Sequence, residues 1–421
     1  MTKEPAKISA SATSMAPMCS FRKVLVICTV FVFLLGIMHF DSLDYRYVTQ
    51  LSKLKLQNVF SSTLQVNDSE RKRQNDSERG DRECETCTSS QLLNLFPQEW
   101  NASDCESIYK WITSSRIQRQ SEGDVIKKVT HVMNCPWHQH KAAAKAFRWE
   151  LRRCCDAAHN CVVTQSNIPA GTEVTYEGEP KRKIRITHQI YALFPKETPL
   201  QRQKYKRCAV IGNSAILTNS SCGANIDAAE YVFRCNLPPM GEAYAQDIGT
   251  KTNLVTANPS IITERYGNLQ DRRRPFYTNL SVYNEALLLL PAFSYTKNTV
   301  LSFRALYTLQ DFQAKQEVVF FNPSYLKHLS DFWNAKGVQA NRLSTGLMVT
   351  SIAIELCEEV RAYGFWPFGV NVHGQVIAHH YFDNQQPKPD IHSMPLEYQH
   401  LLHMHSKGII KLQMAQCQTD P

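Results

Sequence analysis

Residues 208–214 read CAVIGNS, a short run of small and apolar residues that ends in a Gly-Asn-Ser turn. A run of this length and composition is typical of a strand that is buried on both faces of a parallel sheet. Helical patterns follow, most clearly at 324–337 and 344–360. Strands that alternate with helices predict an α/β domain in which helices cover both faces of a mostly parallel sheet. Four further strand-like runs support this fold: KTNLVTANP at 251–259, EALLLLPAF at 285–293, KQEVVFFNP at 315–323 and VRAYGFWPF at 360–368.

The ends of these runs are the first candidates for a ligand site. In an open parallel sheet the ligand binds beyond the carboxyl ends of the strands, which points to Asn213, Asn258 and Pro367. The turn at Asn213 can offer backbone N–H groups and an amide to a phosphate. It has neither the Gly-Lys-Ser/Thr of a P-loop nor a G-x-G-x-x-G pattern, and an ordinary strand-to-loop turn is the simpler interpretation.

Two other groups of residues can carry chemistry. Ser344, Thr345 and Gly346 begin a helical pattern, where a hydroxyl can cap the helix and the helix N-terminus can also bind a carboxylate. Imidazoles suit general base catalysis near neutral pH. The C-terminal region contains six of them: His379, His380, His392, His400, His403 and His405. We expect structural roles for the last three, which lie in a helical pattern.

No resident metal is expected. The histidines lack cysteine or carboxylate partners at zinc-site spacing, and Cys84 and Cys87 form a Cys-x-x-Cys pair without a second pair. The chain also contains no Asp-x-Asp, which transferases of sugar diphosphates often need to hold a metal on the leaving group. A sugar nucleoside monophosphate leaves with less charge, which histidine and backbone N–H groups can stabilise.

The N-terminal part predicts a membrane anchor. Residues 24–40, VLVICTVFVFLLGIMHF, form an apolar run near the lower length limit for a membrane span, and a cleaved signal peptide is the alternative. Basic residues precede the run and acidic residues follow it, so the positive-inside rule leaves residues 1–23 cytoplasmic and the rest lumenal. Residues 41–83 are polar and predict a stem, 84–204 a helical lead-in, and 205–421 the main domain.

Composition agrees with a lumenal protein. The chain has 421 residues and a formal net charge of +9, which by itself suits nucleic acid, a membrane surface or an acidic ligand. A lumenal location argues against nucleic acid. Twelve of the 14 cysteines follow the apolar run, in a compartment where disulfides persist. Five Asn-x-Ser/Thr sequons also follow it, and they predict glycosylation at Asn67, Asn75, Asn101, Asn219 and Asn279.

Residues 205–417 resemble the sialyltransferase family, specifically its α2,8 branch and nearest to the sixth type of that branch. The segments 207–239 and 247–260 resemble the large sialylmotif, and LSTGLMVTSIAIELCEEVRAYGFWPF at 343–368 resembles the small one. HHYFDN at 379–384 resembles the third motif and HSMPLE at 392–397 the very small motif. The resemblance implies a Rossmann-like α/β/α glycosyltransferase domain of the metal-free variant, without a cofactor.

The resemblance also implies roles for single residues. Asn213 and Asn236 match positions that bind the cytidine monophosphate of the donor, and His380 matches a histidine near its phosphate. His392 matches the catalytic base, and Glu397 matches a partner position whose role is structural or catalytic. Contact with the donor sialic acid is implied for Ser344, Thr345, Gly346 and Trp366.

The family's disulfides carry over to Cys208–Cys357 and Cys222–Cys417, with two buried free thiols as the alternative, and leave Cys235 as a buried free thiol. The chain departs from many relatives at His379 and Phe382, where tyrosine is common. Its basic clusters are short, KRKIR at 181–185 and RQKYKR at 202–207, so we do not expect long-chain polymerisation.

The expected activity is therefore transfer of sialic acid from CMP-sialic acid to the 8-hydroxyl of a terminal sialic acid, by an inverting displacement with His392 as base. The expected setting is the Golgi membrane, as a single-pass type II protein. The expected acceptors are sialylated glycoproteins, mainly their O-glycans, or glycolipids, and a homodimer is compatible with the sequence. The alternatives are α2,3 or α2,6 linkage, a non-catalytic sialoglycan-binding protein, and an inactive homologue that acts as a scaffold.

Overall fold

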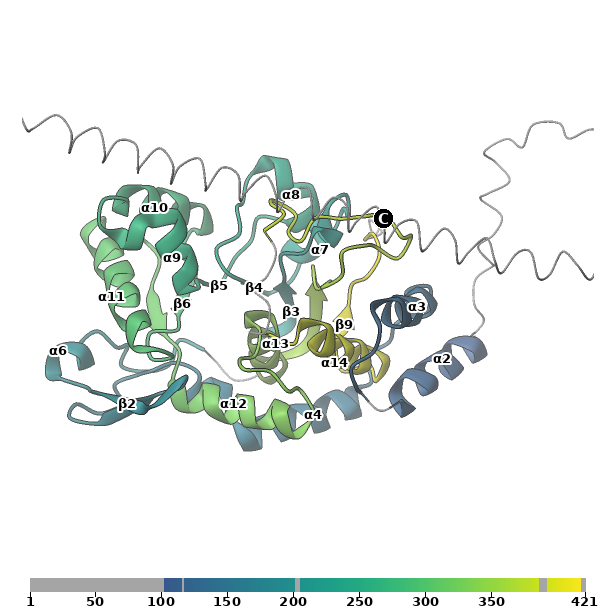
Figure 1. Cartoon of the computed structure of the whole chain (residues 1–421), viewed down its shortest axis with the longest axis horizontal. Helices are drawn as coiled ribbons and strands as arrows, with labels where there is room; N and C mark the ends of the chain where they lie inside the picture. Colours follow the sequence, from purple (N-terminus) through teal and green to yellow (C-terminus); the bar gives the residue numbers. More distant parts are fainter. Residues whose placement is uncertain (1–101, 116, 201–204, 386–391, 418–421) are drawn as a thin grey trace, which may run out of the picture. The chain divides into compact units, whose positions relative to one another are not determined.

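The structure, a computed structural model, describes residues 102–115, 117–200, 205–385 and 392–417 (Figure 1). These residues belong to one unit that spans Leu95–Pro421. The predicted cytoplasmic tail, anchor and stem lie outside the described residues, as do the sequons at Asn67, Asn75 and Asn101. No helix within the described ranges is long and apolar enough to cross a membrane.

Within the described residues, a seven-stranded sheet has the strand order β7-β6-β5-β4-β3-β8-β9. Every neighbouring pair is parallel, which confirms the predicted mostly parallel α/β fold. All residues of β4, β5 and β7 are buried, because helices cover both faces of the sheet. The strands are β3 (Tyr205–Ile211), β4 (Tyr231–Arg234), β5 (Leu254–Thr256), β6 (Leu287–Leu290), β7 (Val318–Phe320), β8 (Cys357–Tyr363) and β9 (Lys411–Leu412).

Alternate residues of the strands enter separate apolar clusters on the two faces. Cys208 and Val210 of β3 pack with helices of one face, while Ala209 and Ile211 pack with helices of the other. Figure 1 shows α4 and α12 on the opposite side of the sheet from α7 and α8. The first face carries α4 (Lys141–Cys154), α5 (Ala157–Asn160), α12 (Pro323–Ala335), α13 (Thr345–Leu356) and α14 (Met394–Ser406). The second carries α7 (Gly223–Asp227), α8 (Glu242–Ile248), α9 (Pro259–Tyr266), α10 (Arg273–Leu280) and α11 (Thr296–Asp311).

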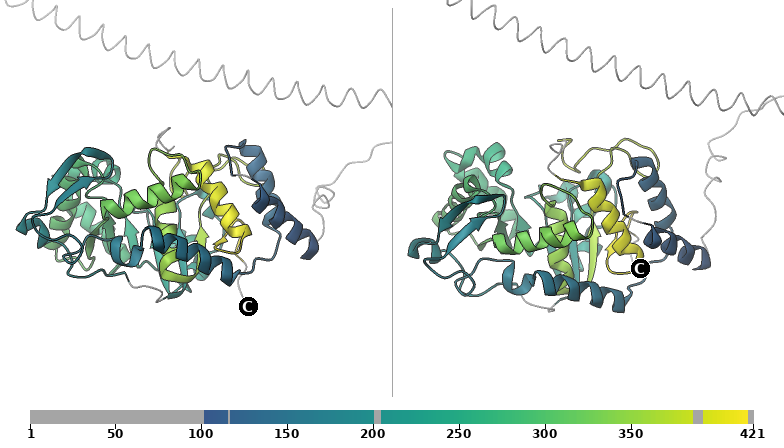
Figure 2. Two further views of the ribbon diagram at one scale, coloured as in Figure 1. Left: turned by 90° about the horizontal axis from the view of Figure 1, so that it is seen from below. Right: turned by 60° about the horizontal axis from the view of Figure 1, so that its bottom comes forward.

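Two groups of elements lie outside this three-layer core. Figure 2 shows the dark blue helices α2 (Ala102–Ser114) and α3 (Glu122–Val132) beside the yellow helix α14, in agreement with their contacts. An antiparallel hairpin, β1 (Glu173–Tyr176) and β2 (Glu179–Arg185), precedes the short helix α6 (His188–Tyr191). The hairpin was not predicted, because its second strand is basic and exposed along most of its length and so lacks an apolar face.

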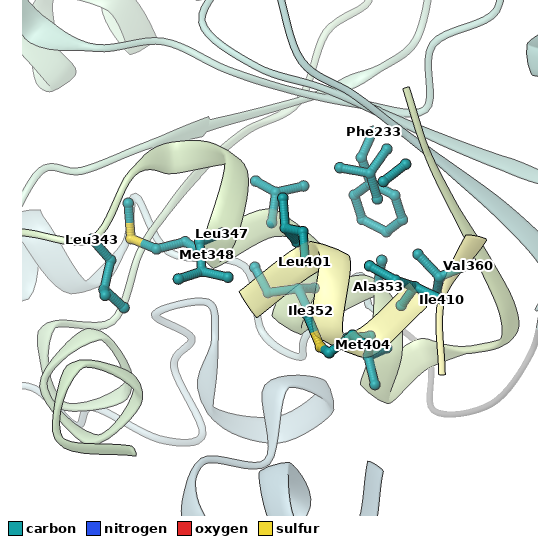
Figure 3. Packing of buried hydrophobic residues seen from close by; sticks show 14 of the residues in the cluster. Phe233, Leu343, Leu347, Met348, Ile352, Ala353, Val360, Leu401, Met404 and Ile410 are labelled. Carbon is teal, nitrogen blue, oxygen red and sulfur yellow. The ribbon is translucent and has the colours of Figure 1, made fainter. Parts of the chain in front are cut away.

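Helix α13 is the most deeply buried helix of the first face. Every residue from Leu347 to Leu356 is buried. Figure 3 shows Leu347 and Ile352 of α13 beside Leu401 of α14, in the cluster that also contains Phe233 of β4. Each fully buried leucine or isoleucine contributes roughly 1.5–3 kcal/mol relative to an exposed one. This packing fixes the turn at Ser344 that precedes the helix.

The predicted helix over 344–360 is wrong at its end. Helix α13 ends at Leu356 and β8 begins at Cys357. The reason is a distant side chain: Arg148 of α4 donates hydrogen bonds to the carbonyls of Ile354 (2.7 Å) and Cys357 (2.5 Å). The guanidinium thereby satisfies carbonyls that the helix end leaves without partners.

The chain reverses direction in the sheet at β3. From β3 it proceeds to β4 on one side, and after β7 it returns to β8 on the other side of β3. The two turns at this switch point approach closely: a Cβ at Gly212 would lie 2.3 Å from the carbonyl oxygen of Gly364. A ligand crevice is expected outside the carboxyl ends of β3 and β8.

Both predicted disulfides are formed. Cys208–Cys357 joins β3 to the junction of α13 and β8, and Cys222–Cys417 joins the start of α7 to the C-terminal segment. Two more were not predicted, Cys105–Cys135 and the adjacent pair Cys154–Cys155. Among the described cysteines, Cys161 and Cys235 remain buried free thiols, as predicted for Cys235.

Candidate active site

Three asparagines lie at the carboxyl ends of three adjacent strands. Asn213 follows β3 and donates a side-chain hydrogen bond to the Cys235 carbonyl (2.9 Å). Asn236 follows β4 with a φ of 64°, and its Oδ1 accepts from the N–H of Asn258, which follows β5 (2.9 Å). The Oδ1 of Asn213 is buried and has no hydrogen-bond partner among the described residues, so a bound ligand can supply one.

The turn before α13 is joined to this row of asparagines. Ser344 is the N-cap of the helix, and its Oγ accepts a hydrogen bond from the Leu347 N–H (3.1 Å). The hydroxyl of Thr345 lies 3.4 Å from Oδ1 of Asn258. A Cβ at Gly346 would lie 2.6 Å from the Phe365 ring, so glycine is needed for this close approach. The N-terminus of α13 thus faces the same edge of the sheet as the asparagines.

His392 is held in a defined tautomer by a main-chain group. Its Nδ1 lies 2.8 Å from the carbonyl oxygen of Arg342. Because a carbonyl can only accept, we assign the ring hydrogen to Nδ1, and Nε2 keeps its lone pair. A half-buried imidazole in this tautomer is ready to accept a proton at Nε2.

Glu397 connects α14 to the turn at Ser344. Its Oε1 accepts a hydrogen bond from the Ser344 N–H (2.9 Å). Burial raises the pKa of Glu397, while the hydrogen bonds from Ser344 and the nearby His392 act in the opposite direction. The carboxylate therefore ties α14 to the N-terminus of α13, which favours a positioning role over proton transfer.

His380 lies beside the turn at Asn213. Ser214 and His380 form an isolated antiparallel bridge, and the Tyr381 N–H donates to the Asn213 carbonyl (2.9 Å). The Nδ1 of His380 lies 2.6 Å from the Asp383 carboxylate, and its ring stacks on Phe382 with centroids 5.0 Å apart. Burial would raise the pKa of Asp383, but hydrogen bonds from His380 and the Gln385 N–H outweigh it and lower the pKa.

Trp366 lies in the apolar core, and its predicted contact with the donor sialic acid stays a prediction. Its side chain is only 4% exposed, and its indole N–H donates to the Val370 carbonyl (2.8 Å). The ring packs edge-on against Phe368 and Tyr398 in the core. The ring is thus used in core packing and the N–H in a main-chain hydrogen bond. Through Tyr398, the residue after Glu397, Trp366 packs against α14.

The two described sequons differ in their surroundings. Asn219 is exposed, and its main-chain N–H donates to the Asp247 carboxylate (2.7 Å). Asn279 is also exposed but lies on α10, with its side-chain amide donating to the Tyr266 hydroxyl (3.0 Å). Glycosylation at both positions stays a prediction.

One residue of the site, Arg342, could not be predicted. Sequence reasoning did not select Arg342, although the residue stands next to the small motif, because its carbonyl acts on a histidine 50 positions away. No cluster of three or more His, Cys, Asp or Glu side chains suited to a metal occurs in the part of the chain that the structure describes. Metal independence remains a prediction.

This arrangement defines a class of protein: a doubly wound α/β enzyme with polar turns and an oriented imidazole at the carboxyl edge of a parallel sheet. A family model for glycosyltransferase family 29 (sialyltransferase) matches residues 162–409, and the chain belongs to this family. The match begins upstream of residue 205 and so includes the β1–β2 hairpin.

Curated relatives are similar over most of their length. The chain is 48% identical to alpha-2,8-sialyltransferase 8F of Mus musculus over 73% of this chain and 77% of that protein. It is 43% identical to alpha-2,8-sialyltransferase 8E of Homo sapiens over 76% of this chain and 86% of the relative. It is 42% identical to alpha-N-acetylneuraminide alpha-2,8-sialyltransferase of Bos taurus over 75% and 88%.

Proposed function

We propose that the protein transfers sialic acid from CMP-sialic acid to the 8-hydroxyl of a terminal sialic acid on a glycoconjugate. The names of the relatives support this linkage. The observation that carries the catalytic proposal is the contact between Nδ1 of His392 and the Arg342 carbonyl, which leaves Nε2 as a base.

The donor lies along the asparagine row. Asn213 and Asn236 bind the cytidine monophosphate, where the buried Oδ1 of Asn213 awaits a donor group. The N-terminus of α13 with Ser344 and Thr345 holds the carboxylate of the donor sialic acid, because N–H groups and the helix dipole favour an anion there. His380, as an imidazolium whose Nδ1–H is donated to Asp383, donates a hydrogen bond from Nε2 to the phosphate.

The reaction is a single inverting displacement. Nε2 of His392 accepts the proton of the acceptor hydroxyl while the hydroxyl oxygen bonds to the anomeric carbon of the donor. The bond from that carbon to the phosphate oxygen breaks, and CMP leaves with the electron pair. Positioning of the two sugars and electrostatic stabilisation of the departing phosphate supply most of the rate.

The cellular setting follows the sequence predictions. The apolar run at 24–40 makes the protein a single-pass type II membrane protein of the Golgi, with its catalytic domain in the lumen. The acceptors are sialylated glycoproteins, mainly O-glycans, or gangliosides. The rival functions are α2,3 or α2,6 transfer and non-catalytic sialoglycan binding, but binding alone does not require an imidazole oriented as His392 is.

An acceptor panel with linkage analysis tests the linkage. Sialylated O-glycans, sialylated N-glycans, gangliosides and galactose-terminated glycans are each incubated with CMP-sialic acid, and the new linkage is determined. We expect sialic acid on sialic acid through the 8-hydroxyl. A product linked only to galactose would favour the α2,3 or α2,6 alternative, and no released CMP with any acceptor would favour the binding protein.

Substitution of His392 tests the base. His392→Ala should lower turnover by at least about 100-fold, the lower range for a general base, while CMP binding measured by calorimetry stays close to wild type. His188→Ala, an exposed histidine on α6, is the matched control and should behave as wild type. Unchanged turnover in His392→Ala would refute the assignment.

A further inference from the structure

Arg342 connects the base to the turn after β6. Its carbonyl accepts the hydrogen bond from His392, and its side chain extends in a different direction, toward residues 294–295. There Nη2 donates to the Ser294 hydroxyl (3.0 Å), and the guanidinium carbon lies 5.7 Å from the centroid of the Tyr295 ring. The main chain of Arg342 therefore contacts the proposed base, while its guanidinium lies at the turn after β6.

The guanidinium of Arg342 has unused hydrogen-bonding capacity. The side chain is half-buried, and its polar contact within the described part of the chain is one neutral hydroxyl, with no carboxylate paired to it. Arg361, by contrast, pairs with Glu359 at 2.6 Å, and Arg148 is occupied by main-chain carbonyls. A guanidinium carries five N–H donors and is suited to a carboxylate that it can bind through two of them.

The order of groups along the sheet places Arg342 on the acceptor side. In the proposed function the nucleotide lies at Asn213 and Asn236, after β3 and β4, and the donor sugar lies at the turn joined to Asn258, after β5. Strand β6 is the next neighbour of β5, and Ser294 follows β6. The group that the donor sugar must react with therefore lies toward Ser294 and Arg342.

The turn after β6 is itself held rigidly by the unpredicted β1–β2 hairpin. The N–H groups of Glu177 and Gly178 donate to the carbonyls of Phe293 (3.1 Å) and Ser294 (2.8 Å). A Cβ at Gly178 would lie 2.3 Å from the Tyr295 ring, so the hairpin turn lies directly against this ring. The surface on which the guanidinium rests is thus preorganised.

We propose that Arg342, positioned by Ser294 and Tyr295, binds the carboxylate of the acceptor's terminal sialic acid. This inference rests on the proposed function, because only a sialylated acceptor brings an anion to this place. The paired guanidinium and carboxylate fix the orientation of the acceptor beside Nε2 of His392. Acceptors that end in galactose cannot form the pair, so the residue determines acceptor specificity.

The test uses acceptors that differ only in charge. Wild type, Arg342→Met and Arg342→Lys are assayed with a sialylated oligosaccharide and with the same compound after conversion of its terminal carboxylate to an amide. Arg342→Met should lower kcat/KM for the acid acceptor by about 10- to 100-fold, mostly through the acceptor KM, and leave the amide acceptor within about twofold. Arg342→Lys keeps the charge but cannot donate two parallel hydrogen bonds, so its kcat/KM for the acid acceptor should lie between those of wild type and Arg342→Met.

Two further readouts separate binding from structure. The donor KM and the slow hydrolysis of CMP-sialic acid in water should not change, since they need no acceptor. Arg304→Met is the matched control, a half-buried arginine on α11 that bonds one main-chain carbonyl, and should leave the acid-to-amide ratio unchanged.

Other outcomes would overturn the inference. Equal losses on the acid and amide acceptors, or a parallel loss of donor hydrolysis, would mean that Arg342 only supports the fold. If Arg342→Met does not fold, as judged by thermal melting, Arg342→Lys is used instead. An equal loss of kcat/KM on the acid and amide acceptors in Arg342→Lys would then overturn the inference. Failure of the proposed linkage is seen separately, because wild-type enzyme would then use galactose-terminated acceptors in preference to sialylated ones.

Discussion

At the scale of the residue, Glu397 allows a positioning role to be distinguished from a catalytic one. Burial raises its pKa above the usual 4.5, so the native protein binds this proton more tightly than the unfolded chain does. Its contribution to stability is present at low pH and is lost as pH rises from 4.5 through the raised pKa. Glu397→Gln removes the titration and keeps an oxygen for the Ser344 N–H.

We therefore expect Glu397→Gln to be at least as stable as wild type at neutral pH. Its melting temperature should depend less on pH than that of wild type between pH 4.5 and the raised pKa of Glu397. Its turnover should stay within about tenfold of wild type. Glu397→Ala is the contrasting variant, which leaves the N–H of Ser344 without its partner and should cost about 1–3 kcal/mol. A loss of turnover in Glu397→Gln as large as in His392→Ala would make Glu397 catalytic.

The location of the candidate site residues at one edge of the sheet could be predicted, but not the tautomer of His392. Asn213, Ser344, His380 and His392 were selected from motifs and strand ends, and the structure brings them to one edge of the sheet. The tautomer of His392 depends on a main-chain carbonyl, and any residue at position 342 could supply that group. Main-chain partners leave no signal in side-chain patterns, and for the same reason Arg342 was missed.

At the scale of the element, α14 carries buried histidines that make it sensitive to acid. Burial lowers the pKa of His400 to about 4 and that of His405 to about 3. Both folded pKa values lie below the usual 6.5, so this stabilising contribution is complete above 6.5 and is lost as pH falls toward the folded values. One pH unit below 6.5, each histidine should cost about 1.4 kcal/mol.

Thermal melting as a function of pH measures this effect. The melting temperature should fall between neutral pH and about pH 5.5, and His405→Asn, which keeps an acceptor for the Leu412 N–H, should fall less steeply. His188→Asn is the exposed control and should follow wild type. A melting temperature that is constant or rises on acidification would contradict the assignment of neutral buried imidazoles.

Element boundaries were harder to predict than element types. The apolar runs at 251–259, 285–293 and 315–323 contain β5, β6 and β7, and the run at 208–212 covers the second half of β3, because continuous apolar residues mark strands buried on both faces. The end of α13 was missed because Arg148 caps it from a helix 206 positions away from Ile354. The periodicity of a segment does not record such a contact.

At the scale of the whole molecule, the disulfides join elements that are far apart in the sequence. The pairs Cys208–Cys357 and Cys222–Cys417 followed from resemblance, whereas Cys105–Cys135 and Cys154–Cys155 did not, since connectivity cannot be deduced from spacing alone. The first pair spans 149 positions and the second 195. Each restricts the unfolded chain by about 5 kcal/mol on the chain-entropy model.

The location of Cys208–Cys357 predicts that its loss lowers stability without affecting chemistry. Cys208 lies in the middle of β3, opposite Val360 in the middle of β8, while Asn213 lies beyond the carboxyl end of β3, about 16 Å from Cys208 at the rise of an extended strand. The double variant Cys208→Ala/Cys357→Ala should lower the urea midpoint by up to the equivalent of about 5 kcal/mol. Its kcat and donor KM, measured below the unfolding transition, should stay within about twofold of wild type.

The free thiol Cys161 provides the control for lost side-chain volume, because it is as deeply buried as the disulfide but bonds to no other sulfur. Cys161→Ala should therefore cost only the small loss of packing, and the reducing agent dithiothreitol should not shift its urea midpoint beyond the shift seen for wild type. If the double variant is as stable as wild type, the bond does not constrain the unfolded chain. If it is unstable and its kcat also falls in the folded fraction, then the disulfide controls the geometry of the asparagine row. The prediction that this bond affects stability without affecting chemistry would then be wrong.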